Sequence, residues 1–180
     1  MKKIALVSLL SLCIAAPALA DETGKPYFAV DLGSATYSNV SPFPNPGMIR
    51  IAGGYHFNKY LAGEIGYTKF GDSTVIATGG SATLTASAFQ IAAVGSYPLT
   101  EQFDLLGKLG ISSNKANGSN TLGTSISSSN SSVLYGVGAQ YHFNSIYTVR
   151  AQYENYGKFE NVSSPMEAST ISLGLVFNFP

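Results

Sequence analysis

The sequence predicts an all-β fold, an eight-stranded antiparallel up-and-down transmembrane β-barrel. Charged residues make up 11% of the 180 residues, against about 25% in typical soluble domains. Apolar residues recur at every second position through most of the chain, which is the period of a β-strand with one apolar face. Beyond residue 20, no apolar run approaches the length of a membrane-spanning helix, about 20 residues. Little charge and no such helix are typical of a membrane barrel, whose outer surface must be apolar.

Residues 1–20 are predicted to be a secretory signal peptide, and residues 21–180 a single barrel domain. Lys2 and Lys3 form a basic start, an apolar stretch covers residues 4–16, and Ala18-Leu19-Ala20 has the small-x-small pattern of a cleavage site. The apolar stretch is too short for a transmembrane helix. Cys13 is the only cysteine, so the mature chain is expected to lack disulfides, thiol nucleophiles and thiolate metal sites.

The alternation predicts eight strands with no domain boundary between them. Their ranges are 26–37, 47–57, 60–70, 83–97, 102–113, 131–143, 146–157 and 168–179. Tight turns are predicted at 58–59, 98–101 and 144–145, and long loops rich in Ser, Asn, Gly and Pro at 38–46, 71–82, 114–130 and 158–167. Short turns at one end and long loops at the other are the pattern of outer-membrane barrels.

Each predicted strand contains apolar residues an even number of positions apart. In chain order these are Phe28, Val30, Leu32; Ile49, Ile51, Tyr55, Phe57; Leu61, Ile65, Tyr67; Phe89, Ile91, Tyr97; Phe103, Leu105, Leu109, Ile111; Val133, Tyr135, Val137, Tyr141, Phe143; Tyr147, Val149, Tyr153; and Ile171, Leu173, Leu175, Phe177, Phe179. The last strand is the most regular and ends on an aromatic residue, as such barrels usually do. Pro180 follows it, and a proline fits the end of a strand poorly because it has no N–H.

The opposite face of these strands collects the polar residues. They are Asp31, Arg50, His56, Glu64, Gln90, Asp104, Lys108, Gln140, His142, Arg150, Gln152 and Glu154, separated by Gly and Ala. Periodicity alone does not say which face points inward, and a soluble lipocalin-like barrel would bury the apolar one. The polar face has too little charge to cover a soluble surface. Aromatic residues also gather near the short turns, as in membrane girdles, so the membrane arrangement is favoured.

Four segments resemble strands of a known family. They are Leu61-Ala-Gly-Glu-Ile-Gly-Tyr, Val94-Gly-Ser-Tyr-Pro-Leu-Thr, Leu106-Gly-Lys-Leu-Gly and Thr148-Val-Arg-Ala-Gln-Tyr. In order and spacing they are similar to the membrane domain of outer membrane protein A and its small single-domain relatives, from about residue 26 to 179. The resemblance implies a monomer in the bacterial outer membrane, in contact with membrane lipid and lipopolysaccharide. It also implies a structural or surface-interaction role.

The family places a charged cluster inside its barrel, and the resemblance carries this onto five residues. Glu64, Lys108 and Arg150 match the cluster in residue type, Gln140 lies where the family has an acid, and Asp31 where it has a base. An acid and two bases in a narrow lumen must also pair on physical grounds, because an unpaired buried charge is costly. We therefore expect a Glu64–Arg150–Lys108 network with Asp31 nearby, acting as a structural plug or as a gate.

Several functions stay open at this point. A porin-like channel for small solutes or apolar molecules is the main alternative, and a soluble periplasmic binding protein is a distant one. The long loops are candidates for contact with host or phage surfaces, and Lys69 and Lys158 near the outer rim for contact with lipopolysaccharide phosphates. Enzymatic activity is not expected, because His56 and His142 both abut short turns, far from the outer rim where lipid-modifying chemistry takes place. No cofactor or metal is expected, and a net charge of zero argues against a nucleic-acid partner.

Overall fold

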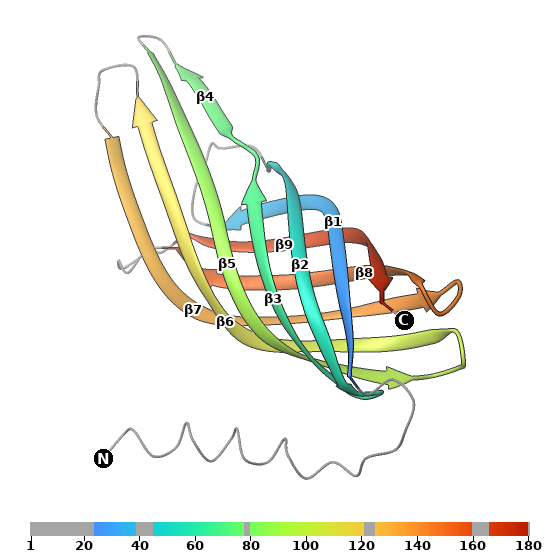
Figure 1. Ribbon diagram of the computed structural model, residues 1–180. Helices are drawn as coiled ribbons and strands as arrows, with labels where there is room; N and C mark the ends of the chain where they lie inside the picture. The colour runs from blue at the N-terminus through green and yellow to red at the C-terminus, as the bar shows by residue number, and fades with distance from the viewer. Residues whose placement is uncertain (1–23, 39–44, 78–79, 121–124, 160–165, 180) are drawn as a thin grey trace, which may run out of the picture.

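The computed structural model describes residues 24–38, 45–77, 80–120, 125–159 and 166–179. The predicted signal peptide at 1–20 lies outside the described residues. Within them the chain forms nine β-strands, shown in Figure 1: β1 (Lys25–Ser38), β2 (Gly47–Asn58), β3 (Leu61–Phe70), β4 (Ser73–Ala77), β5 (Gly80–Pro98), β6 (Phe103–Asn120), β7 (Ser125–His142), β8 (Tyr147–Lys158) and β9 (Glu167–Asn178). No helix in this part of the chain is long and apolar enough to cross a membrane.

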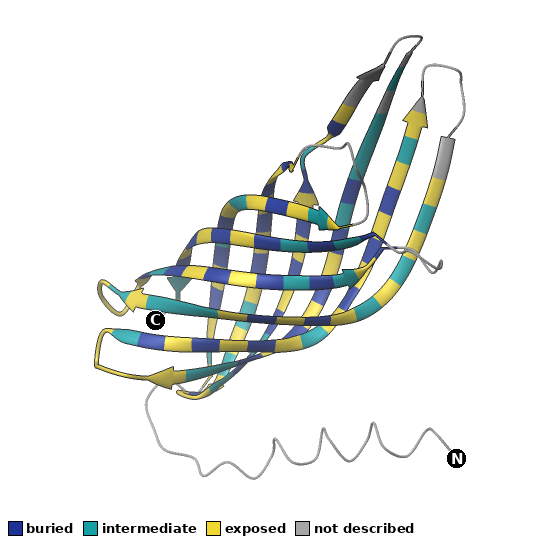
Figure 2. Cartoon of the chain, turned by 180° about the vertical axis from the view of Figure 1, so that it is seen from behind, coloured by how far each residue is buried: buried dark blue, intermediate teal, exposed yellow. Residues whose placement is uncertain are grey.

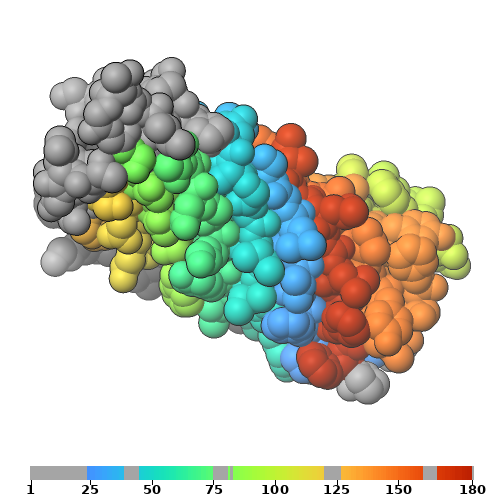
Figure 3. Space-filling view, turned by 90° about the horizontal axis from the view of Figure 1, so that it is seen from above, coloured from blue at the N-terminus to red at the C-terminus, as the bar shows by residue number. Residues whose placement is uncertain are grey.

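The strands close into a ring. Their order is β3-β2-β1-β9-β8-β7-β6-β5-β4, and a further pairing of β3 with β5 joins the ends. Because β4 pairs with β5 beyond the point where β3 ends, β4 prolongs the position of β3 and adds no wall of its own. The result is the predicted eight-stranded antiparallel barrel. Figure 3 shows β2, β1, β9 and β8 as successive cyan, blue, red and orange bands.

The predicted loops at 71–82 and 114–130 are wrong over most of their length. β5, β6 and β7 contain 19, 18 and 18 residues, and the pairing of β6 with β7 continues from Ser113 opposite Ser131 to Ser119 opposite Ser125. The polar composition of 114–130 marks the loss of an apolar outer face, not the end of the strands. A strand that leaves the membrane needs no apolar residues as long as its neighbours satisfy its backbone. β4 and the upper parts of β5–β7, which we call the extension, rise beyond the barrel (Figure 1).

The apolar face of every barrel strand points outward. Ile171 and Leu173 are 71% and 61% exposed, whereas the intervening Ser172 is 4% exposed. Figure 2 shows this alternation of exposed and buried residues along the strands. The lipocalin-like arrangement, which needs the apolar residues inside, is therefore excluded. What the outer face requires is a hydrocarbon environment, which a lipid bilayer supplies.

Candidate functional site

Six charged side chains meet inside the barrel, and we call them the ion network. They project from β1, β2, β3, β6 and β8, because each occupies an inward-facing position of its strand. All are buried, with Lys108 the most exposed at 6%. The members are Asp31, Arg50, Glu64, Lys108, Arg150 and Glu154.

Arg150 holds two carboxylates. Its Nε and Nη2 donate to the two oxygens of Asp31, both at 2.8 Å, in the forked geometry that gives strong, oriented pairs. Its Nη1 donates to Glu64 Oε2, also at 2.8 Å. The phenol of Tyr27 donates to this same Glu64 oxygen at 3.0 Å.

Arg50 and Lys108 complete the network. Lys108 Nζ lies 2.6 Å from Glu64 Oε1 and 2.7 Å from Glu154 Oε1. Arg50 Nη1 lies 2.6 Å from Glu154 Oε1 and 3.3 Å from Glu64 Oε1, and Arg50 Nη2 lies 2.9 Å from Asp31 Oδ2. Every carboxylate therefore contacts at least two cations.

The network is electrically neutral, with three carboxylates against three cations. Its members come from five of the eight barrel positions, so their contacts also brace strands that do not pair with one another. Buried charges are tolerated when they are mutually paired. Removal of one partner leaves a buried charge without compensation, which lowers the stability of the fold by about 3–5 kcal/mol. The network therefore places matched charges of both signs together inside the lumen.

The structure places four of the five predicted cluster residues together, namely Asp31, Glu64, Lys108 and Arg150. Gln140 lies elsewhere: although it is opposite Arg150 in register, its Nε2 donates to Asp104 Oδ2 at 2.7 Å, nearer the short turns. Arg150 is already engaged by the two carboxylates and offers no acceptor to an amide donor.

Sequence reasoning missed Arg50 and Glu154 as members of the network. Both were assigned to the inward face by period, but the family resemblance did not single them out. For Arg50, the opposite charge of its cross-strand neighbour could have predicted membership of the network, because Arg50 lies directly opposite Asp31 when β1 and β2 pair. Glu154 is four residues from Arg150 on the same face of β8, so strand alternation alone places the two in one lumen.

Two glycines make room for these side chains. A methyl group on Gly174 would collide with the carboxylate of Asp31, and one on Gly54 would collide with the ring of Tyr27. Both glycines face inward on strands next to β1, Gly54 opposite Tyr27 and Gly174 opposite Asp31. Their missing side chains let Asp31 and Tyr27 lie flat against the wall and reach the network.

An aromatic layer closes the lumen on the side of the extension. Phe70 packs edge-to-face on Tyr156 and Phe159, with ring centroids 5.5 and 5.7 Å apart. All three rings are fully buried, and Leu134, Met48 and Met166 belong to the same cluster. The hydroxyl of Tyr156 donates to Glu154 Oε2 at 3.1 Å, which joins this layer directly to the ion network.

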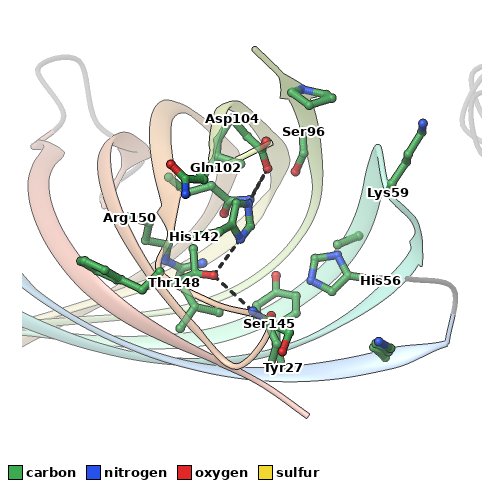
Figure 4. Close-up of a pocket in the computed structure, with 18 of the residues that line it drawn as sticks. Tyr27, His56, Lys59, Ser96, Gln102, Asp104, His142, Ser145, Thr148 and Arg150 are labelled. Atoms are coloured by element: carbon green, nitrogen blue, oxygen red, sulfur yellow. Dashed lines mark hydrogen bonds and ion pairs between the residues drawn. The ribbon is translucent and has the colours of Figure 1, made fainter. Parts of the chain in front are cut away.

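On the other side of the network, a cavity of about 590 Å³ opens among the short turns. Arg150 and Tyr27 lie among its lining residues, and Figure 4 shows His56 and His142 projecting into it. His142 links two strands, with Nε2 2.9 Å from Asp104 Oδ2 and Nδ1 2.9 Å from Thr148 Oγ1. We call this space the mouth cavity.

Asp104, His142 and Thr148 form a hydrogen-bonded row of carboxylate, imidazole and hydroxyl groups. Nucleophilic catalysis uses the same order of groups, but the surroundings of this row do not suit that chemistry. Thr148 is 1% exposed and lies within β8, where neighbouring strands engage the backbone N–H groups that an oxyanion would need. Among the described residues, no three His, Cys, Asp or Glu side chains are grouped to hold a metal ion. The arrangement instead ties β6, β7 and β8 together at the rim.

Comparison with known proteins agrees with this architecture. A family profile described as "Outer membrane protein beta-barrel domain" matches residues 5–179. Ail, the attachment invasion locus protein of Yersinia pestis, has a similar structure in its complex with the heparin analogue sucrose octasulfate, with a TM-score of 0.65 and 19% identity over 87% of this chain and 99% of Ail. No curated protein sequence matches.

Two further solved structures are similar. Neisserial surface protein A gives a TM-score of 0.65 with 20% identity, over 86% of this chain and 97% of that protein. The N-terminal β-barrel domain of OprF from Pseudomonas aeruginosa gives 0.63 with 13% identity, over 87% and 100%. At these identities the likeness establishes the fold, and all three are small outer-membrane barrels.

Proposed function

The chain belongs to the outer membrane protein β-barrel domain family, and on that premise we propose that it is a closed, charge-plugged barrel with a structural or surface-interaction role. It is a protein of the bacterial outer membrane, so by the pattern of such barrels the short turns face the periplasm and the extension faces outward. The observation that carries the proposal is the neutral ion network with the aromatic layer behind it. A lumen filled in this way is suited to stability rather than to passage.

The extension supports the surface-interaction part of the proposal. It carries the upper parts of β5, β6 and β7 away from the membrane, and its outward side chains are mainly Ser, Thr and Asn, such as Ser113, Asn117 and Ser129. Ail was solved with a sulfated sugar, which makes a contact with extracellular polymers a reasonable role for an extended barrel of this kind. We propose no catalytic activity, and we infer a monomer because the apolar belt surrounds the barrel.

A porin-like channel is the second candidate, and the mouth cavity is the observation that favours it. The cavity extends from the short turns as far as Arg150, which is among its lining residues. Recording from single proteins in planar bilayers separates the two functions. A closed barrel gives no steady conductance, whereas a steady current that Lys108→Ala or Arg150→Ala alters would establish the channel and refute the plug.

Surface interaction is tested separately from conductance. Cells that display the full chain are compared with cells that display a barrel in which residues 114–130 are replaced by a two-residue turn. Loss of adhesion to host cells or to sulfated polysaccharide in the trimmed form supports a surface role for the extension. Equal adhesion by both forms removes that role and leaves the structural one.

A further inference from the structure

The mouth cavity carries charges of opposite sign on opposite walls. Lys25 lines it from β1 and Asp104 lines it from β6. In the closed ring of strands, β1 and β6 are four positions apart in either direction, so they face each other across the lumen. The two side chains therefore approach the same space from opposite sides.

Lys25 supplies the positive wall. It is half-buried and lies two residues before Tyr27 on β1, in the same inward phase. Directly across on β2 is His56, whose ring lies 4.8 Å from that of Tyr27, centroid to centroid. No carboxylate in the described part of the chain forms a salt bridge with Lys25. Its charge is thus left for the contents of the cavity.

Asp104 supplies the negative wall. Its side chain is held in place at one oxygen, because Oδ2 accepts hydrogen bonds from Gln140 Nε2 at 2.7 Å and from His142 Nε2 at 2.9 Å. Among the described residues, no side chain donates to the other oxygen, Oδ1. The carboxylate is therefore fixed in position and still has one oxygen able to accept from a ligand.

The remaining charged residues of the lining do not disturb this polarity. Figure 4 shows Lys59 on the side of His56, away from Asp104. Lys59 is exposed on a turn, and its ammonium group lies 4.8 Å from the centre of the Tyr60 ring. Two lysines are thus matched by two acids, since Glu101 also lines the cavity, and Arg150 is already paired within the ion network. A lining with no net charge but with separated signs suits a dipolar ligand better than a simple anion or cation.

We propose that the mouth cavity binds a short peptide with free ends, whose carboxylate accepts from Lys25 Nζ and whose ammonium group donates to Asp104 Oδ1. The inference rests on the proposed orientation, which places the short turns in the periplasm. It goes beyond the proposed function by giving the cavity a ligand. The ion network closes the floor, so the peptide is held at the mouth and is not passed through the barrel.

The dimensions of the lumen fit such a ligand. A volume of about 590 Å³ is within the range of small-molecule sites, about 300–1,000 Å³. Eight strands about 4.8 Å apart and tilted by about 40° place opposite backbones about 16 Å apart. A peptide of two or three residues spans about 7–10 Å, and the flexible stem of Lys25 can adjust to the rest. Gln102 and Ser96 on the lining offer further polar contacts for the peptide bonds.

Titration of the folded, isotope-labelled barrel in lipid nanodiscs, followed by NMR, tests the site. The probes are trialanine, N-acetyl-trialanine, which lacks the ammonium group, and trialanine amide, which lacks the carboxylate. The variants are Lys25→Gln and Asp104→Asn, with Lys59→Gln as the control on the same cavity. Heat-shifted gel mobility in SDS shows for each variant that the barrel is folded, and conductance recordings test the closed barrel independently of peptide binding.

Trialanine should shift the amide signals of residues around the mouth cavity and leave those of the extension unchanged. Each end of the peptide makes a charge-assisted hydrogen bond, so Lys25→Gln and Asp104→Asn should each weaken binding about tenfold. Lys59→Gln should stay within about twofold of wild type, because an exposed charge contributes little. Acetylation of the peptide should cost wild type about tenfold and cost Asp104→Asn nothing further, and the amide should behave in the same way with Lys25→Gln.

The capped peptides keep the test decisive if a variant does not fold, because they remove each charged contact from the ligand side. Equal binding of all three peptides to wild type would overturn the proposal, as would the absence of shifts at the mouth. A loss of binding in Lys59→Gln as large as that in Lys25→Gln would refute the assignment of the carboxylate to Lys25. Tighter binding of N-acetyl-trialanine than of trialanine would show an anion site and refute the dipolar one.

Discussion

Glu64 is the residue whose removal tests the ion network most directly. Its carboxylate contacts Arg50, Lys108 and Arg150 at 3.3, 2.6 and 2.8 Å, and it is 1% exposed. Glu64→Gln keeps the shape of the side chain and removes its charge, which leaves three cations facing two carboxylates. An uncompensated buried charge costs about 3–5 kcal/mol, and because the site is buried this figure needs no reduction for screening by water.

The assay is urea-induced unfolding of the barrel in lipid bilayers. Gel mobility without boiling serves as the readout of the folded fraction, because the chain has no tryptophan to report on folding. The free energy of unfolding should fall by about 3–5 kcal/mol in Glu64→Gln. Ser172→Ala is the control: it removes a buried luminal hydroxyl that has no hydrogen-bond partner in the structure, so a change within about 0.5 kcal/mol is expected.

A second variant separates charge balance from shape. Glu64→Gln/Lys108→Met removes one charge of each sign and leaves Asp31 and Glu154 facing Arg50 and Arg150. If net charge governs the penalty, this double variant should be more stable than Glu64→Gln alone. A Glu64→Gln barrel as stable as wild type, or a double variant in which the two losses simply add, would refute the reasoning.

Three further outcomes are expected. Gly174→Ala should lower the free energy of unfolding by about 1–3 kcal/mol, because the new methyl group meets the carboxylate of Asp31. The same urea titration measures this change. Gly107→Ala is the control and should be neutral, because a methyl group there has no neighbour within 4 Å. Replacement of residues 114–130 by a two-residue turn should leave outer-membrane recovery and the heat-induced mobility shift intact, because the apolar belt lies below Ser113; loss of either would show that the extension is needed for assembly. Mass measurement of the protein from the outer membrane should give a chain beginning at Asp21, and a mass that retains residues 1–20 would contradict the predicted signal peptide.

Alternation of residues was enough to predict the barrel and the inward position of each network residue, because strand geometry sends side chains to opposite faces with a fixed period. It was not enough to say which inward residues meet. Gln140 and Arg50 are both inward, yet only Arg50 joins the network, because contact depends on strand register and on which partners are already saturated. Register is a property of pairing between strands distant in sequence, and the pattern of one strand does not contain it.

The predicted ends of β6 and β7 were wrong for a different reason. Ser113 and the residues after it have the composition of a loop, and the apolar face that marks a membrane strand stops at Ile111. In the structure their backbones pair with β5 and β7, so the strand persists where its apolar pattern does not. Sequence patterns report the environment of a strand, and the environment changes at the membrane surface while the hydrogen bonding continues.

The saturation of the ion network also bears on gating. A gate needs two arrangements of similar free energy, and a network can switch only if a charge has another partner to move to. Here Lys108 already contacts both Glu64 and Glu154, and Arg150 already holds both Asp31 and Glu64. Opening that removed every partner of one charge would leave that charge buried and unpaired, at a cost of about 3 kcal/mol or more. That cost corresponds to an open fraction below about one in a hundred, so single-protein recordings should show at most rare, brief openings. Frequent opening would instead mean that the network rearranges so that each charge keeps one of its two partners.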